Sequence, residues 1–443
     1  MTKSVSMPKI IVFTIFWVGQ IISLVGSGIT GFALGISIYE KTGSTTQLAL
    51  ISLFSTLPGI VLSPIIGVLI DRWQPRLTMI FSSCVAAAIT LCLALLFLAN
   101  KLNIWYIYFG VYIISICSAF QNIANTVAIT LIVPKQHLGR ASGMLQIGEA
   151  SSRLFSPALA GVLVLNFKIQ GVLLIDFITY LFATATLLIV QFPKTKIITE
   201  STESNDNNKD NKNSILFREA FDGWNYIVAR PGLLGLLIFF AIGNFVLGMA
   251  SILITPMLLA FTSAAVLGNV LSIGGSGMLI GTIVMSVWGG PKNRIYGMFY
   301  FGLLQGIFII FIGLRPLIPL ITLACFSVFF TIPIINGCSQ AIWQTKVPKE
   351  MQGRVFATRR MVSWLSFPLA YVLAGPLADY VFEPLLAVNS PLASNVGKII
   401  GVGAGRGIGL LFVVLGALTF VAVCCSYFYK SLRFIEKELP DVV

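Results

Sequence analysis

Hydrophobic positions in this chain of 443 residues form long continuous runs that are separated by short polar segments. About twelve of these runs are long enough to cross a bilayer as helices, since a crossing takes about 20 residues. None of them alternates with a period of two, which excludes a membrane β-barrel. The pattern predicts an all-α integral membrane protein with twelve transmembrane helices. The runs cover roughly residues 10–38, 48–70, 77–99, 104–132, 142–166, 170–192, 232–260, 264–288, 296–314, 317–344, 357–382 and 407–429.

Composition supports the same class of protein. The chain is 57% hydrophobic and only 10% charged, whereas about a quarter of the residues in a soluble domain carry charge. Its net charge of +13 does not indicate nucleic-acid binding, because the basic residues lie in the gaps between apolar runs. We therefore expect the chain to lie in a lipid bilayer and to bind no nucleic acid.

The positions of Lys and Arg predict the orientation. If both ends are cytoplasmic, twenty-two of the 29 basic residues lie in cytoplasmic segments. Because short cytoplasmic loops are enriched in Lys and Arg, we predict a multi-pass protein of the cell (inner, cytoplasmic) membrane with both termini inside. The first run is too long for a signal peptide and is read as a retained span. The other seven basic residues are Lys41, Lys101, Arg153, Lys168, Arg315, Lys398 and Arg406.

Cysteine and histidine usage predicts no metal site and no cofactor. All seven cysteines fall inside apolar runs, and the single histidine, His137, lies in a predicted cytoplasmic loop. Buried cysteine acting as a small apolar residue explains this distribution better than disulfides or zinc. The chain also has no G-x-x-x-x-G-K-[ST] phosphate loop, so we expect no ATP hydrolysis. A membrane enzyme would need a nucleophile–base pair or a metal site within the membrane, and with His137 in a loop and no H-E-x-x-H motif we expect no enzymatic activity.

A polar segment divides the chain into two halves of six runs. We predict an N-terminal bundle over 1–192, a cytoplasmic linker over 193–231 and a C-terminal bundle over 232–443. The linker begins with a stretch too polar to pack. It ends with Phe217, Phe221, Trp224 and Val228 on one helical face, which predicts an amphipathic helix along the membrane surface.

The two halves resemble a repeat. Val133-Pro134-Lys135 with Gly139-Arg140 recurs as Val347-Pro348-Lys349 with Gly353-Arg354. Both matches lie just before the fifth run of their half. Two pseudo-symmetric six-helix bundles follow from this arrangement.

A short charged hairpin joins the second and third runs. Gly67, Asp71, Arg72 and Arg76 match the signature G-x-x-x-D-R-x-G-R-R/K, although Gln74 and Pro75 depart from it. The segment resembles the loop between helices 2 and 3 of the major facilitator superfamily, where it locks the cytoplasmic side of the carrier. The resemblance implies a gate role for Asp71. The alternative is a hairpin that only ends a helix at the membrane surface. The corresponding segment of the second half, Gly289–Arg294, has no acid.

Within that superfamily the chain is most similar to macrolide-efflux-type drug exporters. The resemblance is carried by Gly139-Arg140-Ala141-Ser142-Gly143, Ser156-Pro157-Ala158-Leu159-Ala160-Gly161, Gln352-Gly353-Arg354-Val355-Phe356-Ala357 and Gly375-Pro376-Leu377-Ala378-Asp379.

The resemblance implies a monomeric secondary active transporter that exports amphipathic small molecules, such as macrolide-like drugs, by alternating access and proton antiport. The fourth run lacks the arginine of many proton-coupled drug antiporters. The alternative function is translocation of a lipid, or of a peptide or polyketide natural product, by the same fold.

Charges inside apolar runs need a reason, because each costs roughly 2.5–3.5 kcal/mol to insert. Glu149 and Arg153 lie one helical turn apart and are expected to pair, with a coupling role as the alternative. Asp176 has no basic neighbour in its run and is the first candidate for a proton-binding carboxyl. The alternative to proton binding is a structural role, in which Asp176 is hydrogen-bonded to backbone groups. Asp379 is expected at the membrane interface.

Polar uncharged residues recur in the first, fourth, seventh and tenth runs, which line the central cavity in the family that the chain resembles. Such residues can bind substrate or can hydrogen-bond between helices. The cavity candidates are Gln20, Asn122, Asn125, Asn244, Asn336 and Gln340.

Overall fold

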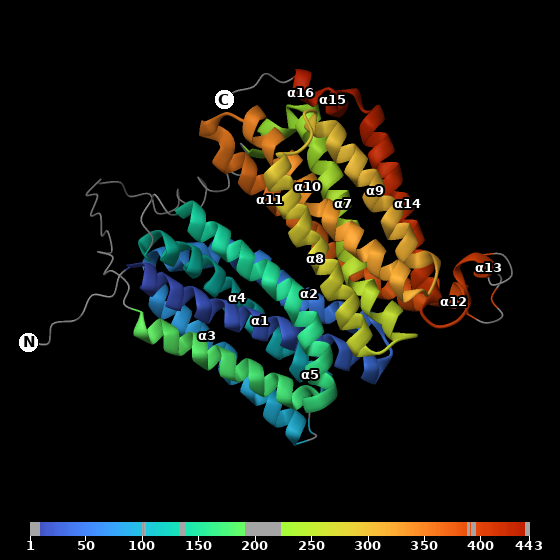
Figure 1. Cartoon of the computed structure of the whole chain (residues 1–443). Helices are drawn as coiled ribbons and strands as arrows, with labels where there is room; N and C mark the ends of the chain where they lie inside the picture. The colour runs from blue at the N-terminus through green and yellow to red at the C-terminus, as the bar shows by residue number, and fades with distance from the viewer. Residues whose placement is uncertain are drawn as a thin grey trace, which may run out of the picture. The chain divides into compact units, whose positions relative to one another are not determined.

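The computed structural model describes residues 9–99, 101, 103–132, 138–190, 223–387, 390 and 396–438, and within these ranges the regular elements are all helical (Figure 1). The chain divides into two compact units. Unit 1 contains Met1–Glu200 together with Ser263–Ser272, and unit 2 contains Ser201–Thr262 with Ile273–Val443. The described residues of each unit are considered separately below.

Unit 1 is built from five long helices, drawn from blue to green in Figure 1. Helix α1 packs along α5, while α4 packs between α2 and α3, and α3 also contacts α5. Every backbone N–H and C=O inside such helices is satisfied within its own segment, as a hydrocarbon surrounding requires. The bounds are α1 Lys9–Thr42, α2 Thr45–Arg72, α3 Pro75–Leu98, α4 Ile104–Ile132 and α5 Leu138–Ile189.

Helix α5 combines the fifth and sixth predicted spans. Its 52 residues are interrupted at Lys168, where φ is 54° and ψ is −176°. A non-glycine residue at positive φ cannot continue a right-handed helix. The interruption lies in the predicted outer loop between residues 166 and 170, so α5 is two crossings joined by a very tight turn.

Unit 2 contains a second set of long helices and several short ones. Helix α9 packs against α10 and α14, and α7 packs against α11 and α14. Helix α11 continues into the π-helix η2 (Leu377–Phe382) and the short α12 (Glu383–Leu385). The remaining bounds are α7 Pro231–Leu259, α8 Ala264–Trp288, α9 Arg294–Leu314, α10 Ile318–Lys346, α11 Lys349–Pro376, α13 Gly397–Ile400, α14 Arg406–Phe428, α15 Lys430–Arg433 and α16 Ile435–Glu438.

The fold-class prediction is confirmed. Eleven helices in the described part of the chain are long and apolar enough to span a membrane. One of them, Ala150–Ile189, is 40 residues long and contains the break at Lys168, so the helices are sufficient for twelve crossings.

Small residues let these helices approach closely. An added Cβ on Gly277 or Gly281 of α8 would meet the backbone of Phe326 or Phe330 on α10. In a membrane, such close approach supplies the dispersion contacts that hold helices together. Both glycines therefore act as helix-packing sites.

The end of the predicted linker packs into unit 2. Residues 223–228 form a short helix in which Ile227 is fully buried and Gly223 lies against the Arg354 carbonyl group. Trp224 and Val228 of this helix are exposed. Phe217 and Phe221 lie outside the described residues.

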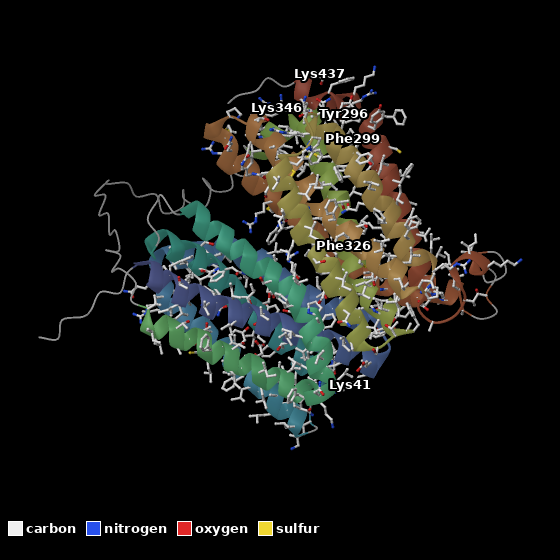
Figure 2. All side chains as sticks on the ribbon, in the orientation of Figure 1. Lys41, Tyr296, Phe299, Phe326, Lys346 and Lys437 are labelled. Atoms are coloured by element: carbon white, nitrogen blue, oxygen red, sulfur yellow. The ribbon has the colours of Figure 1, made fainter. Side chains whose placement is uncertain are left out.

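The C-terminal helices complete one end of unit 2 (Figure 2). Glu436 on α16 accepts hydrogen bonds from the backbone N–H groups of Arg294 and Ile295, both at 3.2 Å. A carboxylate at a helix N-terminus satisfies free N–H groups and stabilises the helix dipole. Lys346, at the end of α10 and 4% exposed, donates to the Glu436 carbonyl oxygen at 2.8 Å. The acid missing from the segment Gly289–Arg294 is thus supplied by the C-terminal tail.

Replacing Glu436 with Gln should lower the stability of unit 2 by about 1 kcal/mol, because the amide removes the negative charge at the α9 N-terminus. The measurement is the apparent midpoint of thermal unfolding of the purified protein in detergent. Glu438→Gln is the matched control, since Glu438 is exposed on the same short helix. Equal midpoints for the two variants would contradict the capping role.

Candidate functional site

The loop between α2 and α3 brings one predicted motif residue into an unexpected contact. Helix α2 ends at Arg72 and α3 begins at Pro75. Arg76 donates from Nε to the Leu187 carbonyl oxygen at 3.0 Å and from Nη2 to that of Leu188 at 2.7 Å. It therefore caps the C-terminus of α5 within unit 1, where free carbonyl groups favour a cation. Gly67, Asp71 and Arg72 lie on the last turns of α2, and their side chains lie outside the described part of the chain.

A buried carboxyl group lies between α1 and the second half of α5. Asp176 is 2% exposed. Ser27 Oγ on α1 lies 3.3 Å from Asp176 Oδ1 and 2.9 Å from the hydroxyl of Tyr180, and it can donate to either. Thr179 Oγ1 lies 3.3 Å from the same Oδ1 and donates to the Asp176 backbone carbonyl at 2.7 Å. We refer to Asp176, Ser27, Thr179 and Tyr180 as the acid cluster.

The close packing of the acid cluster depends on Gly26. A Cβ built on Gly26 would lie 3.0 Å from both Asp176 Oδ1 and Thr179 Cγ2. Only a residue without a side chain lets α1 come this close to α5. No basic side chain is within ion-pair distance of Asp176 among the described residues. The sequence singled out Asp176, but it could not show that the hydroxyl group of Ser27, 149 positions away, would lie beside it.

The structure describes only one side chain of the predicted pair Glu149 and Arg153. Arg153 is exposed on α5. Glu149 lies on the same helix, but its side chain is outside the described part of the chain. The pairing of these two residues therefore remains a prediction.

The predicted cavity residues of unit 1 differ in their surroundings. Gln20 Nε2 and Asn125 Oδ1 are buried atoms for which no hydrogen-bond partner is found among the described residues. Asn122 is exposed on α4. The neighbouring Gln121 instead joins two helices, since its Nε2 donates to Ser83 Oγ on α3 at 2.7 Å. Gln20 and Asn125 thus retain unused hydrogen-bonding capacity.

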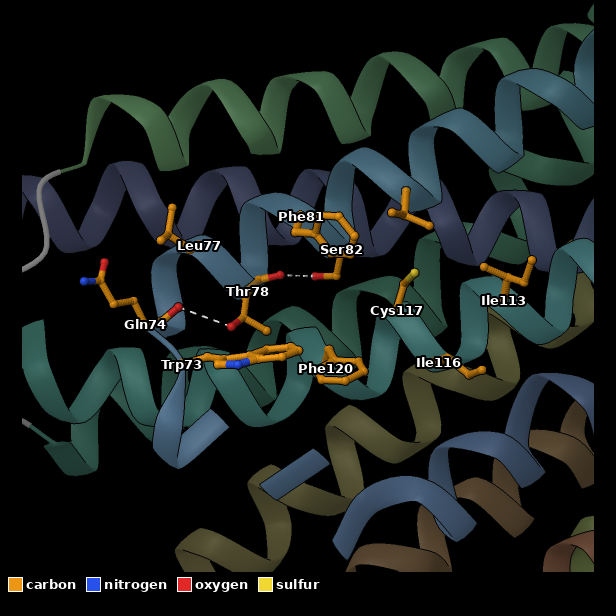
Figure 3. A pocket seen from close by; sticks show the side chains of 11 residues that line it. Trp73, Gln74, Leu77, Thr78, Phe81, Ser82, Ile113, Ile116, Cys117 and Phe120 are labelled. Carbon is orange, nitrogen blue, oxygen red and sulfur yellow. Dashed lines mark hydrogen bonds between the residues drawn. The ribbon is translucent and has the colours of Figure 1, made fainter. Parts of the chain in front are cut away.

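An apolar groove of about 680 Å³ lies between α3 and α4 in unit 1 (Figure 3). The rings of Trp73 and Phe120 are nearly parallel there, with centroids 6.2 Å apart. The hydroxyl groups of Thr78 and Ser82 donate to carbonyl groups of the preceding turn, so they offer no donor to a ligand. Asp176 does not line this groove. The remaining lining residues are Gln74, Leu77, Phe81, Val85, Ile113, Ile116 and Cys117.

Unit 2 contains a charged residue that the sequence analysis overlooked. Arg359 lies on α11, between one and two turns inside the candidate span that begins at Arg354. Its Nη1 donates to Gln340 Oε1 at 2.9 Å, and its Nη2 lies 3.4 Å from Ser339 Oγ. The rings of Trp343 and Phe240 lie 5.3 and 5.9 Å from the guanidinium carbon. Its position inside an apolar run was the signal that could have identified it.

The predicted cavity residues of unit 2 lie near this arginine or on the same helices. Gln340 accepts the hydrogen bond from Arg359 and is otherwise exposed. Asn336 is exposed one turn earlier on α10. Asn244 on α7 donates to the Ser363 carbonyl oxygen on α11 at 3.1 Å, which joins those two helices.

The charged residues near the other end of α11 have a structural role. Glu383 accepts from the backbone N–H groups of Gly405 at 3.2 Å and Ile408 at 3.1 Å, so it caps the start of α14. Arg406 is 4% exposed, begins α14 and donates to the Ile400 carbonyl oxygen at 3.3 Å. Asp379 lies in η2, partly exposed. No group of metal ligands is found among the described residues.

A profile of the major facilitator superfamily matches residues 16–371 of the chain. The chain belongs to the major facilitator superfamily. Its resemblance to macrolide-efflux proteins also appears in known relatives. Macrolide efflux protein A of Streptococcus pyogenes is 29% identical over 381 residues, which cover 83% of this chain and 90% of that protein. The Enterococcus faecalis protein of the same name is 28% identical over 74% of this chain and 99% of its own length.

A more distant relative and two solved structures agree with this membership. The multidrug efflux pump Tap of Mycolicibacterium fortuitum is 22% identical over 83% of this chain and 90% of that protein. The crystal structure of the nucleoside transporter NupG matches with a TM-score of 0.71 at 12% identity, covering 95% of this chain and all of that one. A bacterial homologue of the lysosomal transporter Spinster matches with a TM-score of 0.65 at 14% identity, covering 96% and 98%. At these identities the structures establish only the shared fold of the superfamily.

Replacing Gly26 with Ala should destabilise this superfamily member by about 1–3 kcal/mol, since the new methyl group must displace Asp176 or Thr179. Gly31→Ala is the matched control on α1, because a Cβ there meets nothing within 4 Å. The control should be neutral or slightly stabilising through its helix propensity. Thermal unfolding of both variants in detergent provides the comparison, and an unchanged Gly26→Ala protein would contradict the close packing of the acid cluster.

Proposed function

We propose that this chain exports amphipathic small molecules across the cytoplasmic membrane by alternating access, in exchange for protons, and that Asp176 carries the proton. Membership of the superfamily and the names of its efflux relatives support an exporter. The observation that carries the coupling proposal is a deeply buried carboxyl group surrounded by hydroxyl groups, without a basic partner among the described residues.

The chemistry of the acid cluster suits a group that gains and loses a proton. A charge buried in a membrane protein is costly unless it is paired or hydrogen-bonded. Hydroxyl groups can serve both states, because they donate to a carboxylate and accept from a carboxylic acid. Asp176 can therefore keep partners in each state.

The same contacts connect the proton to helix packing. Ser27 is on α1, whereas Asp176 and Tyr180 are on α5. When Asp176 is charged, Ser27 is held as a donor to its Oδ1. When Asp176 is protonated, Ser27 is free to donate to Tyr180 at 2.9 Å. Protonation thus changes which bonds hold α1 against α5, and such a switch can bias one conformation over another.

The remaining assignments follow the family resemblance. We propose that Asp71 and its motif neighbours Gly67, Arg72 and Arg76 stabilise the closed cytoplasmic side. Both termini are placed in the cytoplasm, as the distribution of basic residues indicates.

The coupling proposal is tested with Asp176→Asn in proteoliposomes that contain a macrolide such as erythromycin. The variant should lose accumulation driven by a pH gradient while keeping substrate counterflow, since exchange of substrate for substrate needs no proton. Asp379→Asn, a partly exposed acid in unit 2, is the control and should retain both activities.

Two outcomes would count against the proposal. Equal gradient-driven accumulation by wild type and Asp176→Asn would remove Asp176 from the coupling step. If the wild-type protein transports no macrolide but does catalyse counterflow of another amphipathic compound, the macrolide is rejected as cargo. The proposal of export is not contradicted by that result.

A further inference from the structure

Arg359 has hydrogen-bonding capacity that the fold does not use. A guanidinium group carries five N–H donors in a planar fork. Among the described residues, Gln340 accepts a hydrogen bond from Nη1, and Ser339 lies within hydrogen-bond distance of Nη2. No bond from its Nε is found among them. The group is therefore held in place by two neutral acceptors and retains donors for a third partner.

The positive charge of Arg359 is also unpaired. This holds for the part of the chain that the structure describes, where no carboxylate lies within ion-pair distance of the guanidinium group. The rings of Trp343 and Phe240 offer cation–π contacts, which are weaker than an ion pair in a desolvated site. A charged residue inside a transmembrane span marks a functional site by default, because its cost must be offset by a partner.

Polar groups near Arg359 also lack partners among the described residues. Ser363, one turn further along α11, is 8% exposed, and its Oγ is a buried atom with no hydrogen bond to any described residue. Its carbonyl group accepts a hydrogen bond from Asn244 of α7. Gln340 is exposed on α10, and no bond from its amide NH₂ group is found in the described part of the chain. Helices α7, α10 and α11 thus converge on Arg359.

We propose that Arg359 and Gln340 bind the carboxylate of an amphipathic ligand. A carboxylate accepts two parallel N–H bonds from a guanidinium fork, and it supplies the negative charge that Arg359 lacks. Phe240, which is only partly buried, lies beside the guanidinium group and is the apolar side chain that the body of such a ligand would meet. The identification of this ligand as exported cargo rests on the proposed export function, whereas the binding site does not.

The next residue of α11, Arg360, has different surroundings and serves as a comparison. Arg360 is exposed, and its guanidinium carbon lies 4.5 Å from the ring of Trp364. It contacts neither Gln340 nor Ser339. Removing this charge changes the net charge of the same helix by the same amount, so Arg360→Gln is the control for Arg359→Gln.

The probes are the steroid carboxylate fusidate and its neutral methyl ester. Apparent affinity is obtained from the ligand-dependent rise in unfolding temperature of the purified full-length protein in a nonionic detergent. Wild type and Arg360→Gln should bind the acid about tenfold or more tightly than the ester, as expected for hydrogen bonds to a charged group. Arg359→Gln should bind both compounds equally and weakly. Arg359→Lys, which keeps the charge but loses the fork, should show a smaller preference.

Equal binding of acid and ester by the wild type would overturn the proposal, as would an unchanged preference in Arg359→Gln. Binding of the ester by Arg359→Gln at wild-type affinity establishes that this variant is folded, and the Lys variant offers a second test if it is not. If the protein binds the carboxylate but shows no proton-driven export, the export function is refuted and this binding site is retained.

Discussion

Helices in a hydrocarbon surrounding gain little by burying apolar side chains against one another, because lipid tails are equally apolar. Their association depends on close approach and on a few polar contacts. The interface between α1 and α5 shows both: Gly26 permits the approach, and Ser27 reaches Asp176 and Tyr180 across it. The same principle explains Gly277 and Gly281 in unit 2, and it makes each buried polar group a constraint on the position of two helices.

The two units use buried charge differently. Unit 1 contains a carboxyl group that is enclosed by hydroxyl groups, with Asp176 only 2% exposed. Unit 2 contains a guanidinium group bounded by an amide, a hydroxyl group and two rings. The halves share a plan of helices, but their chemistry is not symmetric. If Asp176 binds the proton and Arg359 binds an anionic ligand, as we propose, proton and ligand act on different helices of one carrier.

Much of the fold could be predicted from the sequence because hydrophobic runs of this length have few alternatives in a membrane. The break at Lys168 fell in the predicted turn, and Asp176 was recognisable as an acid alone in its span. Partners across long sequence separations could not be predicted. Nothing local indicated that Glu436 would cap α9, or that Arg76 would bind carbonyl groups at the end of α5. Nor did anything local indicate that Arg406 would be buried at the start of α14.

The docking of the C-terminal tail has a consequence for how the protein is made. Glu436 lies 142 residues after Arg294, whose backbone N–H group it binds, so the ribosome adds it well after α9. The cap of α9 therefore becomes available only after α10, α11 and α14 have also been made. Assembly of unit 2 is complete only when α16 reaches the start of α9.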